Sequence, residues 1–150
     1  MRLVIQRVSH ASVEIDSKYF SDIEKGLLIL LGIEETDNDE DINWLCGKIA
    51  RLRVFDDAEG VMNLSIQEVK GELLVVSQFT LHASTKNGNR PSYIKAARPE
   101  TAIPLYEKFV ETLQLETGFQ VKTGCFGAMM QVSLVNDGPV TILIDTKQKE

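Results

Sequence analysis

The sequence predicts an α+β protein in which a largely antiparallel, curled, barrel-like β-sheet packs with two main helices. Two stretches carry apolar residues at helical spacing, and the segments around them are short apolar or alternating runs typical of strands. The expected order is strand, strand, strand, helix, strands, helix, strands, which lacks the steady alternation of a doubly wound parallel sheet. A length of 150 residues suits one domain, residues 1–150, with one core.

The N-terminal part is expected to supply three strands. Residues 2–8 and 11–16 alternate in a strand-like way, and Ser9 and His10 are expected to join them as a tight turn. Residues 26–33 form a continuous apolar run with glycine near both ends, which predicts a buried strand.

The acidic stretch that follows is predicted to open the first helix. Thr36 or Asp37 is expected to be the N-cap, with Glu40 three residues after Asp37 as its capping-box partner. Acidic residues in a first turn also suit the positive end of the helix dipole. Four residues spaced by three or four form the apolar face: Ile42, Leu45, Ile49 and Leu52.

The second half of the chain is expected to place one more helix among strands. That helix is predicted from about Pro99 to Leu115, with Pro104 marking either a later start or a kink. A long loop rich in glycine, asparagine and proline is expected from His82 to Ser92. The expected strands are residues 63–66, 72–79, 119–123, 130–135 and 140–145.

The charge balance limits the kinds of partner. Sixteen basic residues face twenty-two acidic ones, and the net charge of −6 argues against broad, salt-driven binding to nucleic acid. It leaves open the recognition of a single-stranded RNA end in a small pocket. Basic residues do gather locally, within thirteen positions: Lys86, Arg90, Lys95 and Arg98.

Neither a membrane segment nor a metal site is expected. The longest apolar run, Leu27–Leu31, is too short to span a bilayer, and the N-terminal stretch lacks the features of a signal peptide, so a cytoplasmic protein is predicted. Cys46 and Cys125 give no metal spacing and are expected to be buried or half-buried. His10 and His82 have no further ligands at suitable spacing, so no metal is predicted.

The segment Ser77, Gln78, Phe79, Thr80 is a candidate site because it brings polar side chains to the end of an apolar strand. In a regular strand, Thr80 and His82 share a face but lie about 6.6 Å apart, too far for a bond between nucleophile and base. An ordinary Ser-His-acid triad is therefore not expected. Either the strand end satisfies its own polar groups, or its backbone N–H groups form an oxyanion hole.

The segment Asn136–Thr141 lies between the last two expected strands and contains Gly138 and Pro139. A plain hairpin would not need the proline, which removes a backbone donor just where the next strand should begin pairing. The segment therefore predicts either a four-residue turn or a backbone shape held for function.

Several motifs, taken in order, closely resemble the D-aminoacyl-tRNA deacylases. They are Met1–Val8, Ser77–Leu81, Gly88–Ser92, Phe126–Ala128 and Val132–Thr141. The resemblance covers the whole chain at the length of that family. One motif would be weak evidence, but several long motifs in the right order make a chance match improbable.

The resemblance implies an activity and an assembly. Members of the family hydrolyse the ester between a D-amino acid and the 3′-terminal adenosine of tRNA, and they remove glycine from mischarged tRNA, without a cofactor. They are homodimers of a compact α+β fold. The family's Gly-Pro dipeptide, here Gly138-Pro139, has a cis peptide bond and enters the active site of the other subunit. Its carbonyl oxygens would hold the substrate amino group and exclude an L side chain.

The resemblance also implies roles for the other candidate residues. Ser77, Gln78, Phe79 and Thr80 would form the opposing wall, and backbone N–H groups near Phe79 and Thr80 would bind the ester carbonyl. The substrate's own 2′-OH is favoured over the Thr80 hydroxyl as the assisting group. The tRNA end is the expected partner, and its phosphates are the expected contacts of two basic residues, Lys86 and Arg90.

Two positions depart from the family pattern. The family usually has an acidic residue at the position of Met129 and often has one at the position of Ser84. These departures are expected to alter contacts of loops or of the 3′ end rather than the chemistry. The alternative function is a non-catalytic module of the same fold that binds RNA ends; an unrelated small hydrolase or interaction module would not distinguish D from L esters.

Overall fold

A computed structural model describes residues 1–150, which form one mixed sheet, a small two-stranded sheet and three helices. In chain order the elements are β1 (Arg2–Ile15), β2 (Lys18–Ile23), β3 (Gly26–Gly32), α1 (Asp39–Arg51), β4 (Phe55–Asp56), β5 (Met62–Leu64), α2 (Ile66–Val69), β6 (Glu72–Ser77), the 3₁₀ turn η1 (Phe79–His82), α3 (Pro99–Thr117), β7 (Val121–Thr123) and β8 (Gln131–Asp145).

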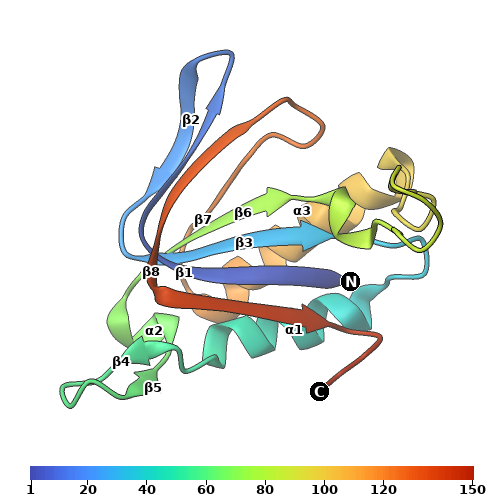
Figure 1. Ribbon diagram of the computed structural model, residues 1–150. Helices are drawn as coiled ribbons and strands as arrows, with labels where there is room; N and C mark the ends of the chain where they lie inside the picture. Colours follow the sequence, from blue (N-terminus) through green and yellow to red (C-terminus); the bar gives the residue numbers. More distant parts are fainter.

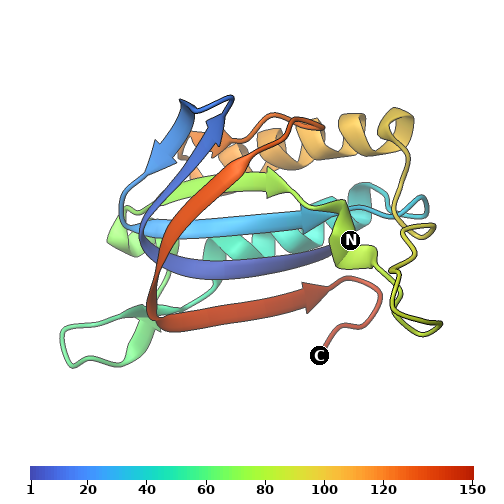
Figure 2. The ribbon, with the colours of Figure 1, turned by 45° about the horizontal axis from the view of Figure 1, so that its top comes forward.

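The main sheet is organised around the long strand β1. Its strand order is β2-β1-β3-β6-β7, and β8 also pairs with β1. The pairs that involve β1 are antiparallel, whereas β3–β6 and β6–β7 are parallel. Figures 1 and 2 show the sheet curling where β1 and β8 bend toward β2. The predicted α+β class with a curled sheet and two main helices is confirmed, and the parallel pairs make the sheet mixed.

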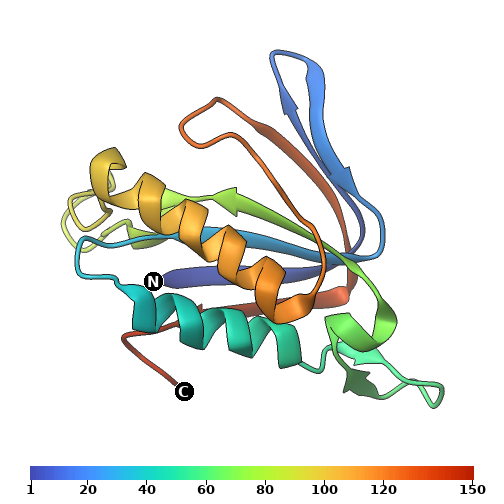
Figure 3. The same ribbon diagram turned by 180° about the vertical axis from the view of Figure 1, so that it is seen from behind.

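Both faces of β3 are buried, which explains its continuous apolar sequence. Leu27, Ile29 and Leu31 belong to a large core beneath α1 and α3, which lie on the same face of the sheet (Figure 3). Leu28 points to the other face and packs in a smaller core with residues of β1, β2 and β6. A strand buried on both sides has no polar face, so its residues do not alternate.

The expected N-terminal turn is wrong. Ser9 and His10 lie inside β1, which runs unbroken from Arg2 to Ile15. The chain reverses instead at Asp16 and Ser17, whose φ angles are 53° and 62°. Two successive residues with positive φ are typical of the tight turns that match the twist of a β-hairpin.

The first helix begins slightly later than predicted. The N-cap of α1 is Asn38 rather than Thr36 or Asp37, and its side chain accepts a hydrogen bond from the N–H of Glu40 at 2.8 Å. Asp41 completes the capping box by accepting from the N–H of Asn38 at 3.0 Å. The sequence offers several acidic and amide side chains in a row, so composition alone does not select the cap.

Other boundaries also shift. The strand expected at 72–79 ends at Ser77, and the one expected at 63–66 is β5 followed by the short helix α2. The predicted second helix is α3, which starts at Pro99 and continues through Pro104. None of the helices combines the length and the apolar character needed to cross a membrane.

The two cysteines differ in their surroundings. Cys46 is fully buried, as expected, and burial raises the pKa of its thiol to about 12. Cys125 is exposed, contrary to the expectation that it would be at least half-buried.

We therefore expect a thiol reagent at pH 8 to modify one cysteine of the folded protein quickly and the other only after unfolding, because the thiolate is the reactive form. Absorbance of the released reagent measures both phases. Cys125→Ser should remove the fast phase, and Cys46→Ser should leave it. A fast reaction at Cys46 in the native protein would contradict this packing.

Candidate active site

The polar residues after β6 form a turn, not the end of a regular strand. The N–H of Gln78 donates to the carbonyl oxygen of Leu31 on β3 at 2.7 Å, and the next four residues are the η1 turn. The strand-based orientation predicted for Thr80 and His82 is therefore wrong. A 3₁₀ turn has three residues per turn, so alternation between two faces does not apply to it.

The η1 turn is anchored from two neighbouring strands. The carbonyl oxygen of Leu81 accepts a hydrogen bond from Nη1 of Arg2 at 2.8 Å, and Arg2 is itself held by Asp145. Behind the turn, a Cβ added at Gly32 would lie 3.0 Å from the carbonyl oxygen of Gln78. The backbone of the turn is thus closely packed against the ends of β1 and β3.

The N–H groups of Phe79 and Thr80 are the first two of this turn. The first N–H groups of a helical turn have no acceptor within it. The hydroxyl of Thr80 instead accepts a hydrogen bond from the side-chain amide of Gln78. The turn therefore offers adjacent backbone donors, while the side chain that resembled a nucleophile is already engaged.

His82 is buried beneath the turn, with 2% of its surface exposed. Its Nδ1 lies 3.2 Å from Oε1 of Glu34, yet neither ring nitrogen makes a hydrogen bond of normal geometry. The closeness reflects packing of the two side chains. Neither ring nitrogen is hydrogen-bonded to the hydroxyl of Thr80, which accepts from Gln78 instead.

A small cavity of about 80 Å³ opens beside the turn. Its lining is mainly apolar and comes from β3, β6, α3 and the segment after β7: Leu31, Ile33, Ser77, Gln78, Phe79, Ala97, Ala102, Phe126 and Gly127. A larger hollow of about 410 Å³ lies between α1 and the end of β8 and contains none of the predicted site residues.

The loop after the turn carries the predicted tRNA-contact residues. Ser84 and Ser92 pair through two backbone hydrogen bonds of 2.8 and 2.9 Å, which close the loop between them. Lys86 and Arg90 lie exposed within that loop. Ser84 therefore closes the base of this loop through its backbone. The other position that departs from the family pattern, Met129, lies on a separate segment and is 83% exposed.

Gly138 and Pro139 form a bulge in one continuous strand, so the predicted alternative of a hairpin turn is wrong. Both halves of β8 pair with β1, and four residues, 137–140, oppose Arg7 alone. The Gly138-Pro139 peptide bond is cis, as the resemblance implied, and both residues are exposed. Bulges of this kind redirect a strand and interrupt its pairing.

Arg7 holds the bulge from behind. It is buried, its Nε donates to the carbonyl oxygen of Asp137 at 3.1 Å, and its Nη1 donates to that of Val54 at 2.7 Å. No role for Arg7 is predicted from the sequence. The available signal was a charged residue in the middle of an apolar strand, where it needs partners.

We expect Arg7→Met to lower the free energy of unfolding by about 1–3 kcal/mol, because the buried carbonyl group of Val54 and the part-buried one of Asp137 lose their donor. Arg51, whose side chain is exposed and pairs with Glu116 at 3.5 Å, provides the matched control. Arg51→Met should change stability by less than about 0.5 kcal/mol. Urea unfolding of both variants measures the difference, and equal effects would contradict the buttressing role of Arg7.

The turn lies at the beginning of β1, whereas the bulge lies opposite the middle of that strand. Arg2 contacts the turn and Arg7 contacts the bulge, and five residues of one strand separate their Cα atoms by roughly 17 Å. Figures 1 and 2 agree, because the bend of β8 is remote from the segment that follows β6. One chain therefore does not bring the two predicted halves of the site together.

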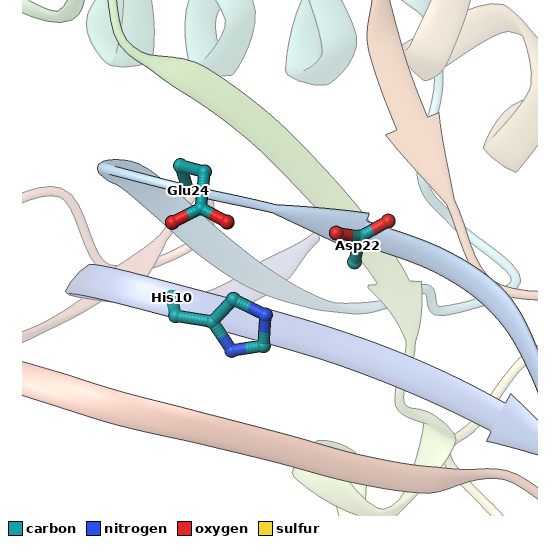
Figure 4. Close-up of side chains that lie close together, drawn as sticks. All are labelled: His10, Asp22 and Glu24. Carbon is teal, nitrogen blue, oxygen red and sulfur yellow. The ribbon is translucent and has the colours of Figure 1, made fainter.

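A separate group of potential ligands lies on β1 and β2. His10, Asp22 and Glu24 have their ligand atoms within 4.8 Å of one another (Figure 4). The expectation that His10 has no suitable partners was wrong, because cross-strand neighbours are distant in sequence. Exposed acidic groups often gather without a metal ion, and this group includes none of the predicted site residues.

Comparisons with known proteins cover nearly the whole chain. Residues 4–145 match the model of the family described as D-Tyr-tRNA(Tyr) deacylase. Proteins named D-aminoacyl-tRNA deacylase are 68% identical in Bacteroides fragilis (strain YCH46) and 65% identical in Flavobacterium psychrophilum, each over 100% of both chains.

Solved structures agree with the fold. The c-Myc DNA unwinding element binding protein superposes with a TM-score of 0.92 at 39% identity, covering 97% of this chain and 99% of the other. A probable eukaryotic D-amino acid tRNA deacylase superposes with a TM-score of 0.81 at 17% identity, covering 95% and 97%, and supports the fold alone. From the family match and the full-length relatives, the chain belongs to the D-Tyr-tRNA(Tyr) deacylase family.

Proposed function

We propose that this protein hydrolyses the ester bond of D-aminoacyl-tRNA in the cytoplasm and releases the free D-amino acid and tRNA. The observation that carries the proposal is the η1 turn, with its two adjacent backbone donors beside a cavity, in a chain that matches full-length relatives of that name. Backbone donors of this kind can stabilise the negative charge that develops on an ester oxygen during hydrolysis.

The N–H groups of Phe79 and Thr80 receive the carbonyl oxygen of the ester. When water adds to the carbonyl carbon, negative charge develops on that oxygen, and each well-placed donor contributes about 100-fold or more to the rate. The bond to the ribose 3′ oxygen then breaks, and that oxygen takes up a proton. The neighbouring 2′-OH of the substrate assists, because the Thr80 hydroxyl is engaged by Gln78.

A second copy of the chain supplies Gly138 and Pro139 to this site, so that the active unit is a homodimer. Arg2, which contacts the turn, and Arg7, which contacts the bulge, have Cα atoms roughly 17 Å apart on β1, and this separation supports the arrangement. The exposure of the bulge supports it as well. Large apolar side chains are also exposed on β8, as at many interfaces: Leu134, Val135 and Leu143.

The backbone of the bulge selects the D configuration of the amino acid. The carbonyl oxygens of Gly138 and Pro139 hold the substrate amino group, and the same backbone blocks the space that an L side chain would need. A wall of backbone reads the configuration at the α-carbon and not the identity of the side chain. Glycine has no side chain to block, so glycine mischarged on tRNA is also removed.

The test compares hydrolysis of D-Tyr-tRNA, L-Tyr-tRNA and Gly-tRNA by the purified protein, with spontaneous hydrolysis subtracted. We expect D-Tyr-tRNA to react faster than L-Tyr-tRNA by more than about 100-fold. Equal rates for the two Tyr esters would refute the chiral mechanism. Binding of the tRNA end without hydrolysis would favour the alternative of a non-catalytic RNA-end-binding module.

A further inference from the structure

Two exposed aromatic rings meet beside the η1 turn. Phe79 is 55% exposed and Tyr93 is 42% exposed, and their ring centroids lie 5.2 Å apart with an interplanar angle of 74°. In this edge-to-face contact one face of each ring is not covered by the other ring. The next residue, Ile94, is 88% exposed and extends the apolar surface.

The chain segment that carries these rings is basic although the protein is acidic, and Glu34 and Glu35 approach it at its end, at Ala96 and Arg98. No acidic residue occurs between Glu72 and Glu100, in a chain that has twenty-two of them. The same interval contains four basic residues, all exposed: Lys86, Arg90, Lys95 and Arg98. A short run of exposed basic residues is complementary to a short polyanion, whereas a duplex would need a broader basic face.

The backbone on both sides of Tyr93 is anchored. Ser92 pairs with Ser84 across the loop, and the N–H of Ala96 donates to the carbonyl oxygen of Tyr93 at 3.0 Å. The N–H of Ala97 then donates to Ile33 at the end of β3 at 2.8 Å. The ring of Tyr93 is therefore presented by an ordered segment, as a stacking surface requires.

We propose that Phe79 and Tyr93 form a base-stacking platform for the unpaired nucleotides that precede the terminal adenosine of tRNA. The proposal rests on the function above, because the N–H of Phe79 fixes where the ester lies. Phe79 is then next to the terminal nucleotide, and Tyr93 lies farther along the strand. Lys86 and Lys95 meet the phosphates, and aromatic stacking tolerates any base because every base has a π-face.

Binding of a short single-stranded RNA that ends in CCA and carries no amino acid tests the platform directly. We expect Tyr93→Ala to weaken this binding by roughly 5- to 100-fold and Tyr93→Phe to preserve it. Tyr19 on β2, which is 73% exposed, gives the control, and Tyr19→Ala should bind as the unmodified protein does. Equal affinities of Tyr93→Ala and Tyr19→Ala would overturn the proposal.

Hydrolysis separates this inference from the proposed function. With Tyr93→Ala, the KM for D-Tyr-tRNA should rise by a similar factor, which lowers kcat/KM. The loss of kcat/KM should be much smaller with the D-Tyr ester of adenosine, because that substrate has no preceding nucleotide. If the unmodified protein hydrolyses neither ester, the proposed function fails. If it hydrolyses both and the two losses are equal, the platform is refuted and the function stands.

Discussion

Replacing Gly138 by alanine is expected to reduce hydrolysis of D-Tyr-tRNA by about 100-fold or more, because displacement of a site group by about 1 Å can cost that much. Gly138 has a φ of +125°, a region that L residues rarely adopt. An added Cβ would lie 2.7 Å from Nη2 of Arg7 and 3.1 Å from Cγ2 of Val140. The bulge, or the Arg7 guanidinium that holds Asp137 within it, must therefore shift, and either change displaces the carbonyl oxygens of the bulge.

Gly60→Ala is the matched control for this change. Gly60 also has a positive φ, +77°, but a Cβ there would meet nothing within 4 Å. Both variants place a side chain on a left-handed backbone, and only one disturbs the bulge. Steady-state rates with D-Tyr-tRNA compare them, with thermal unfolding to confirm that both fold. Full activity of Gly138→Ala would show that the bulge is not part of the active site.

Replacing Phe79 by proline should reduce kcat by a further 100-fold or so relative to Phe79→Ala, because proline lacks the N–H that binds the oxyanion. Phe79 is the first residue of the η1 turn, a position where proline fits. Gln78 before it has φ −144° and ψ 78°, outside the helical region that a following proline disfavours. Both variants remove the ring, so their difference isolates the backbone donor.

Thr80→Ala completes that comparison. It removes the hydroxyl and keeps the N–H, so most of the kcat is expected to remain. Single-turnover hydrolysis of D-Tyr-tRNA by the three variants measures the chemical step apart from product release. If Thr80→Ala lost as much as Phe79→Pro while still folding and binding tRNA, the hydroxyl would be the nucleophile and the backbone mechanism would fail.

The sequence predicted those parts of the fold that depend on local pattern. The buried strand β3 and the helices α1 and α3 follow from apolar spacing and caps, which act within a few residues. The Asp16-Ser17 turn also has a local signal, since aspartate tolerates positive φ, whereas the break in alternation at Ser9 and His10 wrongly predicts a turn there.

The site was less predictable because its shape depends on distant partners. Asn136–Thr141 looks like a turn, and only the pairing of both flanks with β1 makes it a bulge. The same holds for Arg7, whose partners are Val54 and Asp137. The segment Ser77–Thr80 was located because polar side chains end an apolar strand, yet the change from strand to 3₁₀ turn after Ser77 has no clear local signal.

The composite site is tested most directly by mixing two inactive variants, Gly138→Ala and Phe79→Pro, under conditions that let subunits exchange. A hybrid dimer joins the intact turn of one chain to the intact bulge of the other and so regains one of its two sites. With equal amounts and random exchange, we expect about a quarter of the activity of the unmodified protein. A mixture that stays as inactive as its components, with exchange demonstrated by differently tagged chains, would contradict a site shared between subunits.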